Sequence, residues 1–337
     1  MERIRGLEEY VKNKEYREVL GLPKEKTENY ELLAQGEYNI NYVFTHPVTG
    51  KKLLLRVNCG SQMHLEHQIE YEAYTLKLME GSGRTPKVLY VDGSKKILDH
   101  GVLVMEYLPG HTMDYHTELM LAAPCLADIH SVQIPESEEV LIHPQNPLKA
   151  ILEECEEMFK VYLESPLGDE EKKIYIRELL DLGWKREAET RLESGYQCCI
   201  NTELNSTNLL INGEEKSNYL IDWEKPLFGN PAQDLGHFLA PTTTFWKTDV
   251  ILTSEEIEKF IDAYIKAVGN RFKTDMIREH THAFIPITCL RGITWCAMAW
   301  VQYQQPDKLI FNESTFKKLN AYLDMDFLKN IRGYLEP

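Results

Sequence analysis

The chain has 337 residues, of which 43% are apolar and 27% charged, and its formal net charge is −16. This length is enough for two domains, or for one domain of two lobes, with a sizeable buried core. The excess of 53 acidic over 37 basic side chains argues against a nucleic-acid partner, because such proteins normally carry a basic face.

The front part of the sequence predicts a sheet with one long helix, after one or two short polar helices in the first 30 residues. Apolar residues three and four positions apart predict the long helix over residues 63–80, which Gly81 would end. Five apolar runs bounded by turn residues predict strands, at residues 30–34, 39–45, 51–57, 86–92 and 101–107.

Beyond Pro109-Gly110 the pattern is mainly helical, with a predicted hairpin over residues 208–222 that turns at Asn212-Gly213. A strand-rich front followed by a helical half is typical of an α+β fold with two lobes. The expected helices cover residues 118–131, 148–164, 170–193, 254–268, 283–304 and 314–334.

Membrane and redox signals are weak. No stretch approaches the roughly 20 apolar residues of a membrane-spanning helix, since Arg291 interrupts the most apolar segment, residues 289–301. The charged N-terminus lacks the apolar core of a signal peptide, and seven cysteines without paired spacing indicate reduced thiols. We therefore expect a cytoplasmic protein with no membrane partner.

The strongest chemical signal lies between Asn201 and Glu224. Glu203 and Asn208 are five residues apart on a predicted loop, and Asp222 follows the hairpin fourteen residues after Asn208. A loop carboxylate can orient and deprotonate a hydroxyl. An amide and a second carboxylate can hold Mg²⁺, which takes oxygen ligands and commonly binds through one or two carboxylates plus substrate phosphates.

This segment resembles the catalytic loop of the aminoglycoside phosphotransferase and choline kinase superfamily, whose pattern is H-x-D-x-x-x-x-N, a short hairpin and I-D-W/F-E. The next segment, from Gly229 to Leu235, resembles the family's G-x-P-x-x-D-L, in which the Asp braces the loop. The resemblance implies a protein-kinase-like α+β fold with a five-stranded antiparallel N-lobe and a helical C-lobe. The implied bounds are 1–105 for the nucleotide-binding lobe, 106–110 for the hinge and 111–337 for the lobe with the catalytic loop and acceptor site.

The resemblance also implies a nucleotide site in the front half. Gly36 and Asn39 would lie in the strand–turn–strand loop that covers the phosphates. Glu106 and Leu108 would lie in the hinge, whose backbone groups hold adenine.

A basic residue and its partner complete that implied site. Arg56 would contact the nucleotide phosphates, which a guanidinium can grip with two hydrogen bonds. Glu72 would pair with Arg56, with Glu66 and Glu70 as rivals on the same helix. His130, in the helix behind the catalytic loop, is expected to be a buried structural histidine.

Two residues depart from the family pattern at the chemistry: Asn201 replaces the His and Glu203 replaces the Asp. Glu adds one methylene, about 1.5 Å of reach, and a misplacement of about 1 Å can cost on the order of 100-fold in rate. The retained Asn208 and Asp222 favour a working metal site. We therefore predict that Glu203 and Asn201 are catalytic, that Asn208 and Asp222 hold Mg²⁺, and that ATP or GTP is the phosphate donor.

The resemblance implies a phosphotransferase that moves the γ-phosphate to a hydroxyl of a small, amine-bearing and cationic acceptor, such as an aminoglycoside or an amino-alcohol. The sequence leaves open whether Trp295, Trp300 and Tyr303 line the acceptor site or pack in the core. It also leaves open the oligomeric state and a nucleotide-binding pseudokinase. A protein kinase is disfavoured, because no separate activation segment lies between Asp222 and Pro231.

Overall fold

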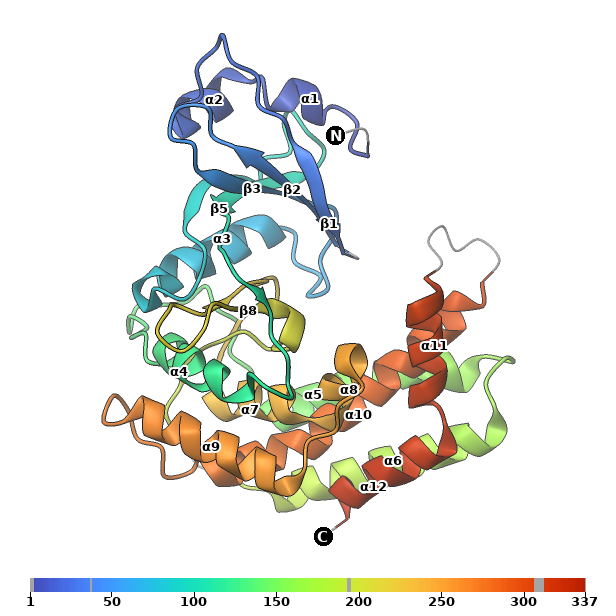
Figure 1. The fold of residues 1–337 in the computed structure, drawn as a ribbon. Coiled ribbons are helices and arrows are strands. Elements are labelled where there is room, and N and C mark those ends of the chain that lie inside the picture. Colours follow the sequence, from blue (N-terminus) through green and yellow to red (C-terminus); the bar gives the residue numbers. More distant parts are fainter. Residues whose placement is uncertain (1–2, 37, 193–194, 306–311, 337) are drawn as a thin grey trace.

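The computed structural model describes residues 3–36, 38–192, 195–305 and 312–336 (Figure 1). A five-stranded antiparallel sheet lies at one end of the molecule and most of the helices lie at the other. The five predicted strands are confirmed, with small shifts at their ends. In the spatial order β1-β2-β3-β5-β4 the sheet contains β1 (Glu31–Gln35), β2 (Asn39–Thr45), β3 (Lys52–Asn58), β5 (Gly101–Glu106) and β4 (Val88–Asp92).

Both faces of this sheet are covered. Val102 and Val104 of β5 belong to the core under α1 (Leu7–Tyr10) and α2 (Lys14–Leu20), whereas the alternating Leu103 and Met105 belong to the core that contains α3 (Gln68–Met79). The short polar helices expected in the first 30 residues are therefore present. The predicted start of the long helix at residue 63 is wrong, because His64 has a φ of 56°, which a right-handed helix cannot include.

The other end of the molecule is helical (Figure 1). A continuous helix over residues 314–334 is wrong, because Asp324 interrupts it and caps the second half by accepting a hydrogen bond from the Asp326 N–H (2.9 Å). The helices are α4 (Leu119–His130), α5 (Pro147–Glu164), α6 (Glu170–Glu189), α7 (Pro231–Leu239), α8 (Pro241–Thr248), α9 (Ser254–Val268), α10 (Ile277–Tyr303), α11 (Glu313–Tyr322) and α12 (Met325–Leu335).

α7 and α8 were not among the expected helices, although each begins with a proline at its first position, where the missing N–H costs nothing. The helix expected over residues 170–193 ends at Glu189, and residues 193–194 lie outside the described part of the chain. α10 begins at Ile277 rather than at residue 283.

α10 runs through the centre of the helical end. Gly236 lets α7 pack closely against it, since a Cβ at this position would lie 2.4 Å from the Cβ of Phe284. Among the described helices, α10 alone is long and apolar enough to cross a membrane, with a mean hydropathy of 1.4, which corrects the expectation that no stretch qualifies. However, 72% of the 18-residue stretch of α10 with this hydropathy is buried inside the fold, as in a core helix.

Two small sheets hold the predicted catalytic loop at both ends. β7 (Cys198–Ile200) precedes the loop and pairs with β10 (Leu227–Gly229). β8 (Leu209–Ile211) follows it, pairs with β9 (Tyr219–Leu220), and so confirms the hairpin predicted for residues 208–222. A third short strand, β6 (His111–Thr112), extends this second sheet.

The chain passes from the large sheet to the helical end through residues 107–110. One buried core contains α3 and β5 residues together with residues of the helical end. The domain bounds expected from the sequence therefore stay a prediction. The seven cysteines are free thiols, as their spacing indicated.

Candidate active site

The loop between β7 and β8 is braced by a buried carboxylate of α7. Asp234 is fully buried and accepts hydrogen bonds from the N–H groups of Asn201 (2.8 Å) and Thr202 (2.7 Å). His130 Nε2 lies 3.1 Å from the same carboxylate and its Nδ1 lies 2.8 Å from the Tyr264 hydroxyl. His130 is thus the buried histidine expected from the sequence, and Asp234 fixes the start of the loop.

Replacing Asp234 by Asn should lower the free energy of unfolding by about 3 kcal/mol, because an amide nitrogen would then face the buried backbone donors. Urea unfolding measures the change. The exposed Asp262, which pairs with Arg278 on the surface, supplies the matched control: Asp262→Asn should change stability by less than about 0.5 kcal/mol. Equal effects of the two variants would contradict the bracing role.

The β8–β9 hairpin brings Asn208 and Asp222 together. The N–H of Ile221 donates to the carbonyl oxygen of Asn208 (2.9 Å). The amide nitrogen of Asn208, rather than its oxygen, contacts the loop, by donating to the carbonyl of Glu203 (3.0 Å). Asp222 has a φ of 66°, and such left-handed backbone in a non-glycine residue is concentrated at functional sites.

The donor atoms at this position fit Mg²⁺. An amide oxygen and a carboxylate are the hard oxygen ligands that this ion prefers. Within the described residues, no three His, Cys, Asp or Glu side chains gather in a way that could hold a metal ion. A cation between Asn208 and Asp222 would therefore need phosphate oxygens of a substrate to complete its ligand shell, as Mg²⁺ commonly does.

Arg56 of β3 links the sheet to this hairpin. Its Nη1 lies 2.5 Å from Glu72 Oε1 and 3.1 Å from Asp222 Oδ1, and its Nε donates to Asn41 (3.0 Å). Burial acts to lower the pKa of Arg56, but the charges of Glu72 and Asp222 outweigh it and raise the pKa. The ion pair implied by the resemblance is present, and Glu72, not the less buried Glu70, forms it.

A cavity of about 260 Å³ lies beside Arg56. The segment after β5 forms part of its wall, through Glu106, Tyr107 and Leu108. Of the residues predicted to bind nucleotide or metal, the cavity is lined by Arg56, Glu72, Glu106, Leu108 and Asp222. An apolar wall and the guanidinium of Arg56 thus line one cavity.

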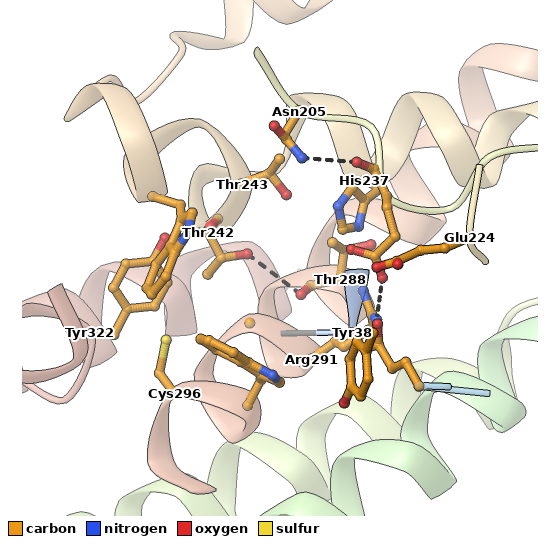
Figure 2. A pocket seen from close by; sticks show the side chains of 15 residues that line it. Tyr38, Asn205, Glu224, His237, Thr242, Thr243, Thr288, Arg291, Cys296 and Tyr322 are labelled. Atoms are coloured by element: carbon orange, nitrogen blue, oxygen red, sulfur yellow. Dashed lines mark hydrogen bonds and ion pairs between the residues drawn. The ribbon is translucent and has the colours of Figure 1, made fainter. Parts of the chain in front are cut away.

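A second cavity, of about 300 Å³, is lined by Glu203 and Glu224. One face of α10 forms much of its wall, with residues three and four positions apart, as neighbours on a helix surface must be. Figure 2 shows Tyr322, Thr242 and Cys296 on one side of this cavity and His237, Glu224 and Arg291 on the other. The α10 residues are Thr288, Arg291, Gly292, Trp295 and Cys296.

Glu203 carries a negative charge into the second cavity. Its Oε1 lies 2.8 Å from Arg291 Nη2. Burial would raise the pKa of Glu203, but the positive charges of Arg291 and Lys225 outweigh burial and lower the pKa to about 2. The carboxylate is therefore ionised at neutral pH and can accept a hydrogen bond from a hydroxyl.

Residues 29–279 match the family model described as the phosphotransferase enzyme family, which is well over half of the chain. The chain belongs to this family. No curated protein sequence matches it.

The fold of this phosphotransferase family member is similar to that of several solved structures. Plasmodium vivax ethanolamine kinase is 16% identical, with a TM-score of 0.62 over 96% of this chain and 93% of that one. A putative aminoglycoside phosphotransferase from Ralstonia eutropha is 13% identical (TM-score 0.65; 96% and 98%). Spectinomycin phosphotransferase, solved with ADP and spectinomycin, is 14% identical (0.61; 92% and 93%). At these low identities, the TM-scores show the shared fold alone.

Two residues predicted for the nucleotide loop of this family member lie elsewhere. Neither Gly36 nor Asn39 lines the first cavity, whose wall on this side is formed by Leu33, Ala34 and Asn41. The N–H of Gly36 donates to the carbonyl of Asn39 (2.9 Å), which closes the turn between β1 and β2. Position 37 of that motif lies outside the described residues.

The side chain of Asn39 instead joins the two ends of the molecule. Its amide nitrogen donates to the Glu224 carboxylate, and its amide oxygen accepts from Asn58 (2.9 Å). The Gln68 amide donates to the carbonyl of Glu224 (2.7 Å). Burial, followed by the charge of Asp222, raises the pKa of Glu224 to about 8.

Asn201, predicted to be catalytic, lines neither of these two cavities and is fully buried. Its side-chain nitrogen donates to the Asp222 carbonyl (2.8 Å), and its oxygen accepts from the Glu203 N–H (3.0 Å). In this phosphotransferase family member Asn201 therefore ties the backbone at Glu203 to the backbone at Asp222, and its catalytic role stays a prediction.

The sequence left open whether three aromatic side chains of α10 line a cavity or pack in the core, and the structure places them differently. Trp295 lines the second cavity and meets Trp246 edge-on, with ring centroids 5.3 Å apart. Trp300 donates to Asn320 (3.0 Å), and Tyr303 stacks on Phe316 of α11. Only Trp295 of the three predicted rings is therefore a cavity residue.

Sequence reasoning missed two charged or titratable neighbours of Glu203. Arg291 was noted only as an interruption of an apolar segment, although a charge in a buried helix needs a partner. His237 of α7 also lines the second cavity. Burial lowers the pKa of its imidazole to about 4, against the influence of Glu203, so His237 is neutral at pH 7.

Proposed function

We propose that the protein is an ATP-dependent phosphotransferase that moves the γ-phosphate of Mg·ATP to a hydroxyl of a small, amine-bearing molecule. The observation that carries this proposal is the juxtaposition of two cavities: one contains Arg56 and Asp222, and the other contains Glu203 and Glu224. Asn201 joins Glu203 to Asp222 through two hydrogen bonds, so donor and acceptor would meet at this loop.

The donor side follows from the first cavity. Adenine would lie against the segment from Glu106 to Leu108, and the guanidinium of Arg56 would contact the phosphates. Asn208 and Asp222 would hold Mg²⁺, which when bound neutralises charge on the transferring phosphate. Arg56 already lies against Asp222, so the nucleotide phosphates would enter between existing charges.

The acceptor side follows from Glu203. With Oε1 on Arg291, its other carboxylate oxygen would accept the hydrogen bond of the acceptor hydroxyl. That hydroxyl oxygen would attack the γ-phosphorus as the bond to the β–γ bridging oxygen breaks, and the hydroxyl proton would pass to Glu203. The products would be ADP and a phosphate monoester. Positioning supplies most of the rate in this chemistry.

The lining of the second cavity supports an amine-bearing acceptor. Trp246 and Trp295 offer ring faces to a cation on one side. On another side lies Glu224, whose raised pKa an approaching ammonium group would lower, so that the ionised carboxylate would form on binding. Two of the similar structures are named as an ethanolamine kinase and an aminoglycoside phosphotransferase, which agrees with this acceptor class.

Trp295→Ala should raise KM for the acceptor about tenfold and leave KM for ATP unchanged, because a lost ring contact to a cation is worth about 1–2 kcal/mol. Trp300→Ala is the control, since Trp300 lies on the same helix and does not line the cavity. Steady-state kinetics measure both constants. If Trp300→Ala raises the acceptor KM as much as Trp295→Ala, the cavity is not the acceptor site.

The proposed function is tested by ADP release with Mg·ATP and a panel of amino-alcohols, aminoglycosides and their amine-free counterparts. Acceptor-dependent ADP release with a phosphorylated product in the mass spectrum would support it. Stabilisation by Mg·ATP in a thermal-shift assay without any acceptor-dependent release would instead favour the pseudokinase.

A further inference from the structure

Glu203 is the first of four charged side chains that contact one another in turn, and the proposed reaction does not use the other three directly. Arg291 of α10 contacts Glu203 Oε1 through Nη2 (2.8 Å) and Glu154 Oε2 of α5 through Nε (3.1 Å). Glu154 Oε1 in turn contacts Lys225 Nζ (3.0 Å). Two positive and two negative side chains therefore alternate from the catalytic loop through α10 and α5 to the segment before β10.

These four side chains are partly buried, with those of Glu203 and Glu154 26% and 33% exposed. The side chain of Arg291 is 15% exposed and that of Lys225 is 14% exposed. Burial acts against the charge of Arg291, but Glu203 and Glu154 outweigh it and raise the pKa of the guanidinium. Removing one member would leave another buried charge without its partner, which is costly, so the side chains hold one another in place.

We propose that Arg291 is the positioning residue of Glu203, with Glu154 as its anchor. The inference rests on the proposed function, in which Glu203 receives the acceptor hydroxyl. A guanidinium has a rigid fork of donors, so contacts to two carboxylates fix both its place and its orientation. Arg291 thereby restrains one oxygen of a long side chain and leaves the other toward the acceptor cavity.

The length of Glu203 makes this restraint necessary. Glu has one more rotatable side-chain bond than Asp, and each lost rotamer freedom must be offset by a contact. A misplacement of about 1 Å can lower the rate on the order of 100-fold. The contact to Arg291 supplies the fixed placement that the backbone of the loop alone does not give to a side chain of this length.

Kinetics of single variants test the proposal. Arg291→Met should lower kcat about 100-fold with KM for ATP unchanged, and Arg291→Lys should recover part of the loss, because it restores the charge without the second contact. Glu154→Gln, which touches neither reactant, should lower kcat about tenfold through Arg291. Glu203→Asp should also lower kcat, because the side chain of Asp is about 1.5 Å shorter and its carboxylate cannot reach Arg291.

A double variant separates placement from independent effects. Glu203→Asp with Arg291→Met should fall no further than the more damaging single variant, because both remove the same restraint. The control is Glu156→Gln on the same helix as Glu154, which weakens the ion pair of Glu156 with Arg177 (2.8 Å). It should leave kcat unchanged. A double-mutant cycle of Arg291→Lys and Glu203→Gln, measured by urea unfolding, gives the coupling free energy between the two side chains without any turnover.

Three results would overturn the inference: full kcat in the Arg291 variants, a loss confined to the acceptor KM, or losses in the double variant that multiply. A thermal unfolding curve verifies that each variant is folded at the assay temperature. If Arg291→Met does not fold, Arg291→Lys and Glu154→Gln still test the proposal. The wild-type protein reports the proposed function alone. If the wild type shows no acceptor-dependent ADP release, the proposed function fails. If the wild type is active and the Arg291 variants are unimpaired, only the positioning role fails.

Discussion

Asp222→Asn is expected to abolish measurable phosphate transfer and to weaken Mg·ATP binding together. The substitution removes the negative charge that faces both Arg56 and the predicted cation, while its shape is nearly unchanged. We expect kcat to fall on the order of 1000-fold, the scale typical of losing a group that stabilises transition-state charge. The Kd for Mg·ATP should rise about tenfold, which isothermal titration measures.

The control for Asp222→Asn is Asp181→Asn, which removes one negative charge from the exposed surface of α6. It should change neither constant. Normal turnover in the Asp222 variant would end the assignment of this carboxylate, and normal nucleotide affinity with lost turnover would place its role at the transition state alone.

Glu203→Gln should cut turnover while sparing nucleotide binding. The amide keeps the length and can still accept from Arg291, so the change tests charge rather than placement. Loss of a proton-accepting group costs about 100- to 10,000-fold. Steady-state ADP release gives kcat, and titration with Mg·ATP should show an affinity within about twofold of the wild type.

Glu153→Gln provides the matching control on α5, where Glu153 is exposed and pairs only loosely with Lys149 (3.7 Å). This variant should behave like the wild type in both assays. Full activity in the Glu203 variant would mean that another group receives the acceptor proton, and the roles of Glu203 and Arg291 would both fall.

The parts of the site that are close in sequence could be predicted from it. The hairpin after Asn208 carries Asp222 back beside Asn208, because a tight turn at Gly213 (φ 116°) returns the strand. The pairing of Arg56 with Glu72 was implied by the family resemblance and is present at 2.5 Å. Apolar runs bounded by turn residues predicted the strands, and such runs are expected where both sheet faces are covered.

The parts of the site that depend on contacts between distant segments could not be predicted from the sequence. Arg291 and Glu203 are 88 positions apart, and no local spacing encodes their contact. The one available signal was physical: an arginine inside an apolar helix must find a carboxylate. The contact of Asn39 with Glu224, 185 positions away, is equally hidden from local spacing, and its predicted role at the phosphates stays a prediction.

Some local signals were present but outweighed. Asp324 is a strong helix-capping residue, yet the apolar spacing on either side of it is nearly in phase and predicts one helix. His64 shows the opposite case, since nothing in its neighbourhood requires the positive φ that delays α3.

The stripe of α10 that lines the proposed acceptor cavity has an engineering consequence. Trp295, Cys296 and Gly292 belong to one helix that contributes nothing to the lining of the nucleotide cavity. Libraries varied at Trp295 and Cys296 would therefore explore new acceptors while the proposed donor cavity keeps its lining. Gly292 should stay fixed, because a Cβ there would lie 2.6 Å from the Cβ of Thr242. Arg291 should stay fixed in such a library, because it lies on the same stripe and its side chain contacts the carboxylate of Glu203.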